Sequence, residues 1–254
     1  MKIKWYGTAS ISIETENEKI LFDPFIPLKG SKIKTTISDF KEYNQIFITH
    51  GHFDHIGSLK KISKDHQIKI HCTKTPYHVL LKKKLPKEYF NIIEPNQIIN
   101  LNNLTIKTYQ GKHIEYDEGA IKKIILTPRT YKYFYNLPTI IRENKICQEN
   151  NEILIYEVKT ELKTILMMGS LGLDANTNYP KNCDLFIMPY QGKKDLLTPS
   201  IEIINKLKPK NILLIHFDDT FPPISKDVCI SDLQEKLDKN INLIIPKYQK
   251  DIIF

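Results

Sequence analysis

The segment Thr49-His50-Gly51-His52-Phe53-Asp54-His55 follows the apolar run Ile46-Phe47-Ile48 and holds three of the eight histidines of the chain. The apolar run is typical of a buried strand, and in extended chain the side chains of residues i and i+2 point to the same side. His50 and His52 can therefore present two imidazoles to one point just beyond the strand end. Asp54 and His55 stand at the entrance of the next helix, where they can face a second point close by. Imidazole and carboxylate together match the ligand preferences of zinc and iron, so the segment predicts a metal site.

On the amino-terminal side of this segment, the sequence predicts a β-meander. Its three short strands, at 2–6, 10–14 and 19–22, are separated by turns. Asp23-Pro24 ends the meander, because proline cannot donate to a strand ladder. Around and beyond the histidine segment, the pattern alternates between strand and helix: a strand at 45–49, a helix at 56–63, a strand at 68–72 and a helix opening at Pro76.

The second half of the chain also mixes strands and helices. Pro199 to Leu207 predicts a helix with Thr198 as its N-cap. Apolar runs predict further strands at 104–109, at 153–158 and 164–168 as a hairpin, at 184–188, and at 211–215.

The irregular stretch Ile114 to Glu149 reads as a lid or insertion over one end of the sheets. Its aromatic residues Tyr131, Tyr133, Phe134 and Tyr135 can either line a substrate pocket or form a small core of the insertion itself.

The segment from His50 to His55 resembles the H-x-H-x-D-H motif of the metallo-β-lactamase superfamily. Further features stand at the expected places: Gly7-Thr8-Ala9-Ser10 before a strand, Asp23-Pro24, Gly111-Lys112-His113 after a strand, and His216 at the end of a strand. The resemblance covers Met1 to about Pro223. It implies an α/β fold, a four-layer αββα sandwich in one domain over residues 1–254, with the metal site at one edge between the two halves.

Carried over residue by residue, the resemblance implies two sets of metal ligands. His50, His52 and His113 form the first, and Asp54, His55 and His216 form the second. The cofactor is then one or two Zn²⁺ ions, with Mn²⁺ or Fe²⁺ as alternatives. The three remaining histidines match no motif position and read as structural or surface residues: His66, His71 and His78.

The chain departs from the family at one ligand. The family usually supplies a bridging aspartate from a Gly-Asp pair that ends a strand, and here that place reads Met168-Gly169-Ser170. The three-histidine set stays whole, while the second set is weakened. An acid elsewhere can compensate, and the candidates are Asp174, Asp218 and Asp219, although an acid that follows a strand is more often a cap or a surface group.

The pair Gly169-Ser170 and the segment that follows His216 look similar to the sequences of a bacterial branch of metal-dependent hydrolases. The pattern is nearest to that of the ascorbate-6-phosphate lactonase-like group. The implied chemistry is hydrolysis by a metal-bound hydroxide, with Asp54 as the catalytic residue that orients or deprotonates the water. Esters, lactones, thioesters, amides and phosphodiesters all remain open as substrates. The rival interpretation is a non-catalytic metal- or ligand-binding protein on the same fold, which Ser170 keeps open.

The length and composition of the chain limit the classes of protein to which it can belong. With 254 residues, 41% of them hydrophobic, the chain can bury a continuous core. It has no apolar run of about 18 residues and no signal-peptide pattern, so we expect no membrane segment and a cytoplasmic location. Four dispersed cysteines favour reduced thiols. The net charge of +8 comes from scattered lysines, which favours a solvated surface over a nucleic-acid groove. We therefore expect no nucleic-acid partner, and the substrate that the resemblance implies is a small molecule. The oligomeric state stays open.

Overall fold

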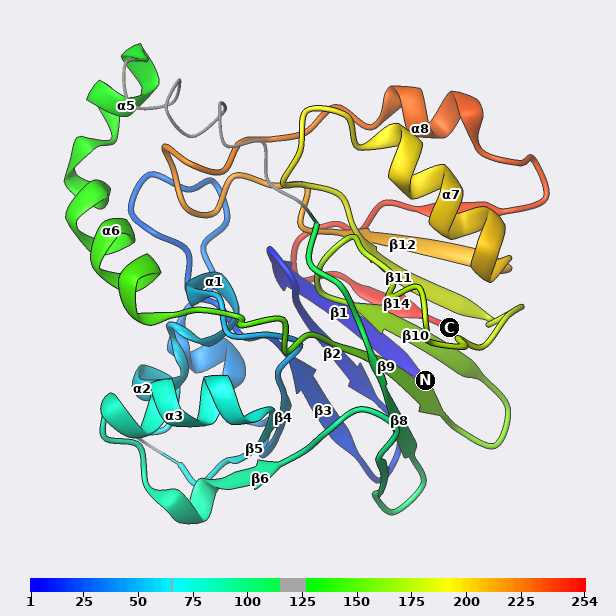
Figure 1. The fold of residues 1–254 in the computed structure, drawn as a ribbon, viewed down its shortest axis with the longest axis horizontal. Coiled ribbons are helices and arrows are strands. Elements are labelled where there is room, and N and C mark those ends of the chain that lie inside the picture. Colours follow the sequence, from blue (N-terminus) through cyan, green and yellow to red (C-terminus); the bar gives the residue numbers. More distant parts are fainter. Residues whose placement is uncertain (65, 115–126) are drawn as a thin grey trace.

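The computed structural model describes residues 1–64, 66–114 and 127–254. Within this part of the chain, two seven-stranded sheets face each other, and helices cover their outer sides (Figure 1). The first sheet has the order β14 (Asp251–Ile253), β1 (Lys2–Gly7), β2 (Ser10–Glu14), β3 (Lys19–Phe22), β4 (Gln45–Phe47), β5 (Lys69–Cys72) and β6 (Phe90–Ile92). The second has the order β13 (Asn242–Ile244), β12 (Asn211–Ile215), β11 (Leu185–Pro189), β10 (Thr164–Met168), β9 (Leu154–Lys159), β8 (Thr105–Gln110) and β7 (Ile98–Asn100).

The alternation of side chains along the strands builds the four layers. All five residues of β11 are buried, yet they face two different cores. Leu185 and Ile187 point into the core between the sheets, while Phe186 and Met188 point to the outer core. That outer core is closed by α7 (Leu197–Leu207) and α8 (Ser231–Lys236). The predicted αββα sandwich is therefore confirmed.

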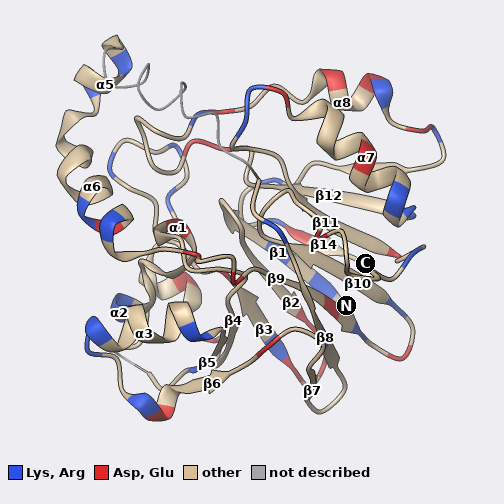
Figure 2. Ribbon diagram, in the orientation of Figure 1, with Lys and Arg blue, Asp and Glu red and all other residues tan. Residues whose placement is uncertain are grey.

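The other outer layer covers the first sheet. It consists of α1 (Phe53–Ile56), α2 (Leu59–Ile62) and α3 (Lys74–Lys82), which bury Ile56, Leu59 and Leu80 against Ile46 and Ile70 of the strands. The Lys and Arg residues are spread over helices and loops in the view of Figure 2, with Asp and Glu among them. No helix in the described residues is both long and apolar enough to cross a membrane.

Three predicted helices need correction. The helix expected to open at Pro76 begins two residues earlier, at Lys74, with Thr73 as its N-cap. The helix expected at 56–63 is two short helices, α1 and α2, separated at Gly57 and Ser58, and Ser58 Oγ accepts a hydrogen bond from the backbone N–H of Ile26. The helix expected to start at Pro199 with Thr198 as N-cap begins at Leu197 instead. Asp195 takes the capping contact, since its Oδ1 accepts a hydrogen bond from the Thr198 N–H.

The predicted insertion at 114–149 lies partly outside the described residues. Its described remainder is helical rather than irregular, with α5 (Pro128–Lys132), a 3₁₀ turn at Phe134–Asn136 and α6 (Leu137–Ile146). These elements run along one side of the molecule beside the loops that follow β3 and β12 (Figure 1). Ile140 and Cys147 join the core that lies outside the first sheet.

Candidate metal centre

Strand ends bring the predicted ligands together. The histidine segment follows β4, His113 follows β8 and His216 follows β12. Asp54 and His55 lie in the first turn of α1, whose N-cap is His52. The ligands thus come from both sheets.

The first ligand group consists of His50, His52 and His113, whose ligand atoms lie within 4.8 Å of one another. His50 Nε2 and His52 Nδ1 are 3.2 Å apart. Two nitrogens bound to one tetrahedral zinc are expected about 3.3 Å apart, from Zn–N bonds of about 2.05 Å. The distance between His50 Nε2 and His52 Nδ1 therefore fits two ligands of one zinc ion.

Oxygen atoms orient two of these rings. His113 Nδ1 lies 2.7 Å from the carbonyl oxygen of Ile114, so Nδ1 donates and Nε2 is left with its lone pair. His50 Nδ1 lies 2.9 Å from the hydroxyl of Thr49. Each contact fixes one ring nitrogen and leaves the other for a metal.

Burial keeps the first group uncharged. It lowers the pKa of His50 well below its ordinary value, and neighbouring histidines lower it further. Burial also lowers the pKa of His52 and that of His113 to about 4. The neutral imidazole is the form that binds metal, so this group is ready to bind at neutral pH.

The second ligand group consists of Asp54, His55 and His216, again with ligand atoms within 4.8 Å. Asp54 Oδ2 lies 3.0 Å from His216 Nε2 and 3.6 Å from His55 Nε2. Burial acts to raise the pKa of the Asp54 carboxyl, but the two histidines hold it below its ordinary value. The carboxylate is therefore ionised and can act as a ligand or as a proton acceptor.

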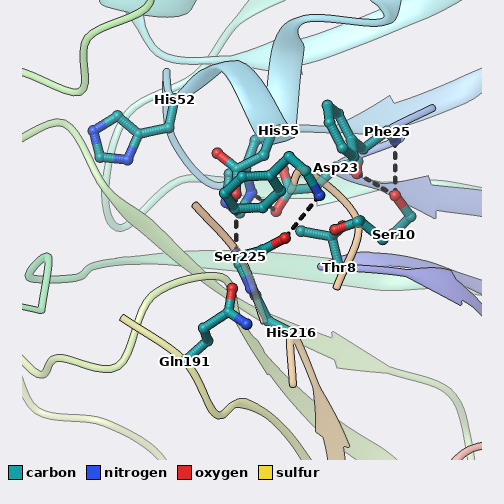
Figure 3. A network of polar contacts seen from close by, with 12 residues as sticks. Thr8, Ser10, Asp23, Phe25, His52, His55, Gln191, His216 and Ser225 are labelled. Carbon is teal, nitrogen blue, oxygen red and sulfur yellow. Dashed lines mark hydrogen bonds and ion pairs between the residues drawn. The ribbon is translucent and has the colours of Figure 1, made fainter. Parts of the chain in front are cut away.

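Sequence reasoning missed the role of Asp23, which is fully buried beneath His55 (Figure 3). Asp23 Oδ2 lies 2.8 Å from His55 Nδ1, and it also accepts a hydrogen bond of 2.6 Å from the Thr49 hydroxyl. Its Oδ1 accepts one from the Thr49 N–H. A carboxylate on one ring nitrogen orients the other toward a metal. The signal in the sequence is Asp23-Pro24, which we interpret from the sequence as a strand end and as a feature of the resemblance, without a contact to a histidine.

The first and second ligand groups lie next to each other, and their ligand atoms are of the kind that binds divalent metal ions. The rings of His50 and His55 have their centroids 3.9 Å apart. His216 Nδ1 is buried and has no hydrogen-bond partner among the described residues. Five imidazoles and one carboxylate in such proximity match the ligand set of zinc and related ions.

Ser170 contacts the site indirectly. Its Oγ accepts a hydrogen bond of 3.1 Å from the N–H of Ile114, the residue after His113. At position 169 a Cβ would overlap the Thr49 side chain, which explains the glycine before it. Ser170 therefore braces the His113 segment.

The three acids considered as substitutes have other contacts. Asp174 accepts hydrogen bonds within its own loop, from Asn176 N–H and the Thr177 hydroxyl. Asp218 accepts from the Thr8 N–H, and Asp219 is paired with Arg129. None of the three belongs to a ligand group in the described part of the chain.

The aromatic residues of the insertion do not form a core of their own. Tyr131 is 85% exposed and Phe134 63%. Tyr133 lies against Gly30, whose positive φ of 96° and close approach leave no room for a Cβ. Arg129 fastens the insertion to the loop after His216, through Asp219 and the carbonyl oxygen of Ser225.

Comparisons with known proteins agree with this fold. A family model described as the metallo-beta-lactamase superfamily matches residues 3–129. A UPF0173 metal-dependent hydrolase from Staphylococcus aureus (strain MRSA252) is 26% identical over 238 residues, which cover 89% of this chain and 90% of that protein. A metallo hydrolase from Ignicoccus hospitalis has a TM-score of 0.64 at 16% identity, over 99% of this chain and 97% of that one. Zn²⁺-bound PqqB from Methylobacterium extorquens has a TM-score of 0.62 at 9% identity, over the full length of both chains.

Proposed function

Because this chain belongs to the metallo-β-lactamase superfamily, we propose that it hydrolyses a small molecule at the centre formed by its two ligand groups. The observation that carries the proposal is the convergence of five imidazoles and one carboxylate, drawn from both sheets, at one edge of the sandwich. We assign the six residues as metal ligands: His50, His52, His113, Asp54, His55 and His216.

Zinc is the metal we propose, with Mn²⁺ or Fe²⁺ as alternatives, since the donor set is rich in nitrogen. A divalent metal supplies Lewis acidity and lowers the pKa of water at such a centre. The substrates that respond to this chemistry are esters, lactones, thioesters, amides and phosphodiesters. Four unpaired cysteines fit a reducing compartment, so we propose the cytoplasm as the location.

Asp54 has the geometry of the general base. Its carboxylate is ionised, is buried at the centre, and has His55 and His216 on one oxygen, Oδ2. It can accept a proton from the attacking water and orient that water toward the substrate. His55 is held in turn by Asp23, so the base and its neighbours are fixed before substrate arrives.

The test is hydrolysis by zinc-loaded protein of a panel with one member of each substrate class. Asp54→Asn keeps the size of the side chain but removes its charge, so turnover of the best substrate should fall by about 10²–10⁴-fold. Asp227→Asn is the matched control, because Asp227 lies on the surface and, within the described part of the chain, its ion-pair partner is Lys32. Near wild-type turnover in Asp54→Asn would exclude the assigned role.

The alternative is a protein that binds metal or ligand without turnover. The observation that favours it is Ser170, a neutral side chain where the family usually has a bridging carboxylate. Tight binding of one metal with no turnover across the whole panel would support this alternative instead.

A further inference from the structure

Asp218 is a buried carboxylate that neither ligand group uses. It lies two residues after His216 and is only 5% exposed. Both of its oxygens accept hydrogen bonds from one donor, the backbone N–H of Thr8, at 3.0 and 3.1 Å. It forms no ion pair with any described residue. Burying a carboxylate away from water costs free energy unless hydrogen bonds offset the loss. The contact with Thr8 is therefore expected to have a structural role.

Thr8 connects Asp218 to the metal ligand. Its carbonyl oxygen accepts a hydrogen bond of 2.8 Å from the backbone N–H of His216. Both residues have left-handed backbone, with φ of 51° at Thr8 and 57° at His216. Non-glycine residues seldom adopt this conformation, and they keep it only where surrounding contacts hold it.

Further contacts hold the same two turns together. The hydroxyls of Thr8 and Thr220 are 2.6 Å apart. The ring of Phe217 stacks on Trp5, with centroids 5.1 Å apart. Figure 3 shows Thr8 and His216 side by side below His55. The turn after β1 and the turn after β12 thus form one unit.

This unit joins the two halves of the molecule at the second ligand group. Thr8 follows β1 of the first sheet, whereas His216 follows β12 of the second. Asp54 and His55, the partners of His216, are carried by the first sheet. The position of His216 relative to them therefore depends on the contacts between these two turns. His113 in the first group is braced elsewhere, by Ser170 through Ile114.

We propose that Asp218 is a positioning residue for His216. By accepting the Thr8 N–H, it holds the Thr8 carbonyl oxygen against the His216 N–H, and so sets the metal affinity of the second ligand group alone. The inference rests on the proposed metal centre, but it concerns binding and not turnover.

The experiment is calorimetric titration of metal-free protein with Zn²⁺, with circular dichroism and thermal unfolding to verify the fold. His216→Ala identifies which equivalent belongs to the second group. Asp218→Ala removes the acceptor and should weaken that equivalent at least tenfold, while the other changes less than twofold. Asp218→Asn retains an oxygen that can accept the Thr8 N–H, so it should stay within about threefold of the wild type. Asp227→Asn is the control, because Asp227 is an exposed acid that pairs with Lys32, and this variant should bind as the wild type does.

The inference is overturned if a folded Asp218→Ala binds both Zn²⁺ equivalents with unchanged affinity, or if its affinity for both falls equally. It is also overturned if Asp218→Asn binds the second equivalent as weakly as Asp218→Ala does. A wild type that binds only one equivalent at excess Zn²⁺ would overturn it as well. If Asp218→Ala does not fold, hydrogen exchange of the wild type decides. The amides of Thr8 and His216 should be protected in metal-free protein, and free exchange at either would contradict the inference. If the metal affinities change as expected but the protein hydrolyses no member of the substrate panel, the result counts against the proposed hydrolase function and not against the role of Asp218.

Discussion

Ser170 affects how tightly the second ligand group can hold a metal ion beside the first. Two cations at close range repel, and a shared carboxylate normally offsets that repulsion. Here a hydroxyl occupies the position and accepts a hydrogen bond from Ile114 instead. The second metal should therefore be held less tightly than the first.

We predict that extensively dialysed wild type retains about one metal per chain or less, with the second bound only when metal is supplied. Ser170→Asp should tighten the second equivalent roughly tenfold or more, because it adds a negative ligand. Ser170→Ala is the control, which loses the brace on Ile114 and gains no ligand. Elemental analysis and calorimetry measure both quantities, and two equally tight equivalents in the wild type would contradict the prediction.

His52 tests the first ligand group. His52→Ala removes one of three imidazoles, so most of the metal bound after dialysis should be lost, at least tenfold in affinity. The fold should survive, because the side chain lies at the edge of the sandwich and not in a core. His78→Ala on the exposed side of α3 is the matched control. Metal retained at the wild-type level in His52→Ala would refute the assignment.

At the scale of elements, polar contacts fasten the described part of the insertion at separate points. Asn136 Nδ2 donates to the carbonyl oxygens of Lys29 and Pro222, and Glu143 pairs with Lys83. α5 is tied to the loop after His216 by the Arg129 guanidinium, which pairs with Asp219 and donates to Ser225. Hydrogen bonds to charged groups contribute about 1.5–3 kcal/mol each. Most other side chains of α5 and α6 face solvent. The insertion should therefore open more easily than the sheets.

Arg129→Met should raise the rate of proteolytic cleavage within 127–146 about tenfold or more, since local opening becomes about 1.5 kcal/mol easier. Arg142→Met is the matched control, because Arg142 is exposed and its ion-pair partner among the described residues is the neighbouring Glu143. Equal cleavage rates in the two variants would show that Arg129 is not the anchor.

The sequence predicted strands better than helix starts, for physical reasons. Strands such as β10 and β12 are runs of apolar residues, and their bounds were predicted correctly. The predicted start of α7 was wrong because the N-cap is Leu196, and Asp195, the residue before it, accepts the hydrogen bond from the Thr198 N–H. Four of the six proposed ligands, His50, His52, Asp54 and His55, came from one motif. The other two, His113 and His216, came from their places after strands, whereas the support from Asp23 required knowing how the turn after β3 folds back.

At the scale of the whole molecule, burial of a histidine makes stability depend on pH. His71 stacks on Phe47, with ring centroids 4.2 Å apart, and its ring nitrogens contact Gln45 and Asn91. Burial, and to a lesser extent Lys69, lower its pKa from 6.5 to about 4. Between these two values the unfolded chain binds a proton that the folded chain does not, so stability is full above pH 6.5 and falls as the pH falls towards 4.

We predict that His71→Gln loses about 1–2 kcal/mol less stability than the wild type between pH 7 and pH 5. Urea unfolding of metal-free protein at the two pH values measures the difference. His66→Gln serves as the control, since it also removes one histidine. An equal loss in His71→Gln and in the wild type would contradict the assignment.

The pairing of β14 with β1 has a consequence in time. Lys2 pairs with Ile253, so the first sheet is completed by residues from opposite ends of the described chain. Contacts so distant in sequence slow folding, because a long loop must close before they can form. At a synthesis rate of about 5–20 residues per second, β1 waits roughly 10–50 seconds for its second neighbour. During that interval its outer edge presents unpaired backbone groups to other strands. A newly made chain therefore passes through a period of exposure to aggregation that lasts until β14 has been made and pairs with β1.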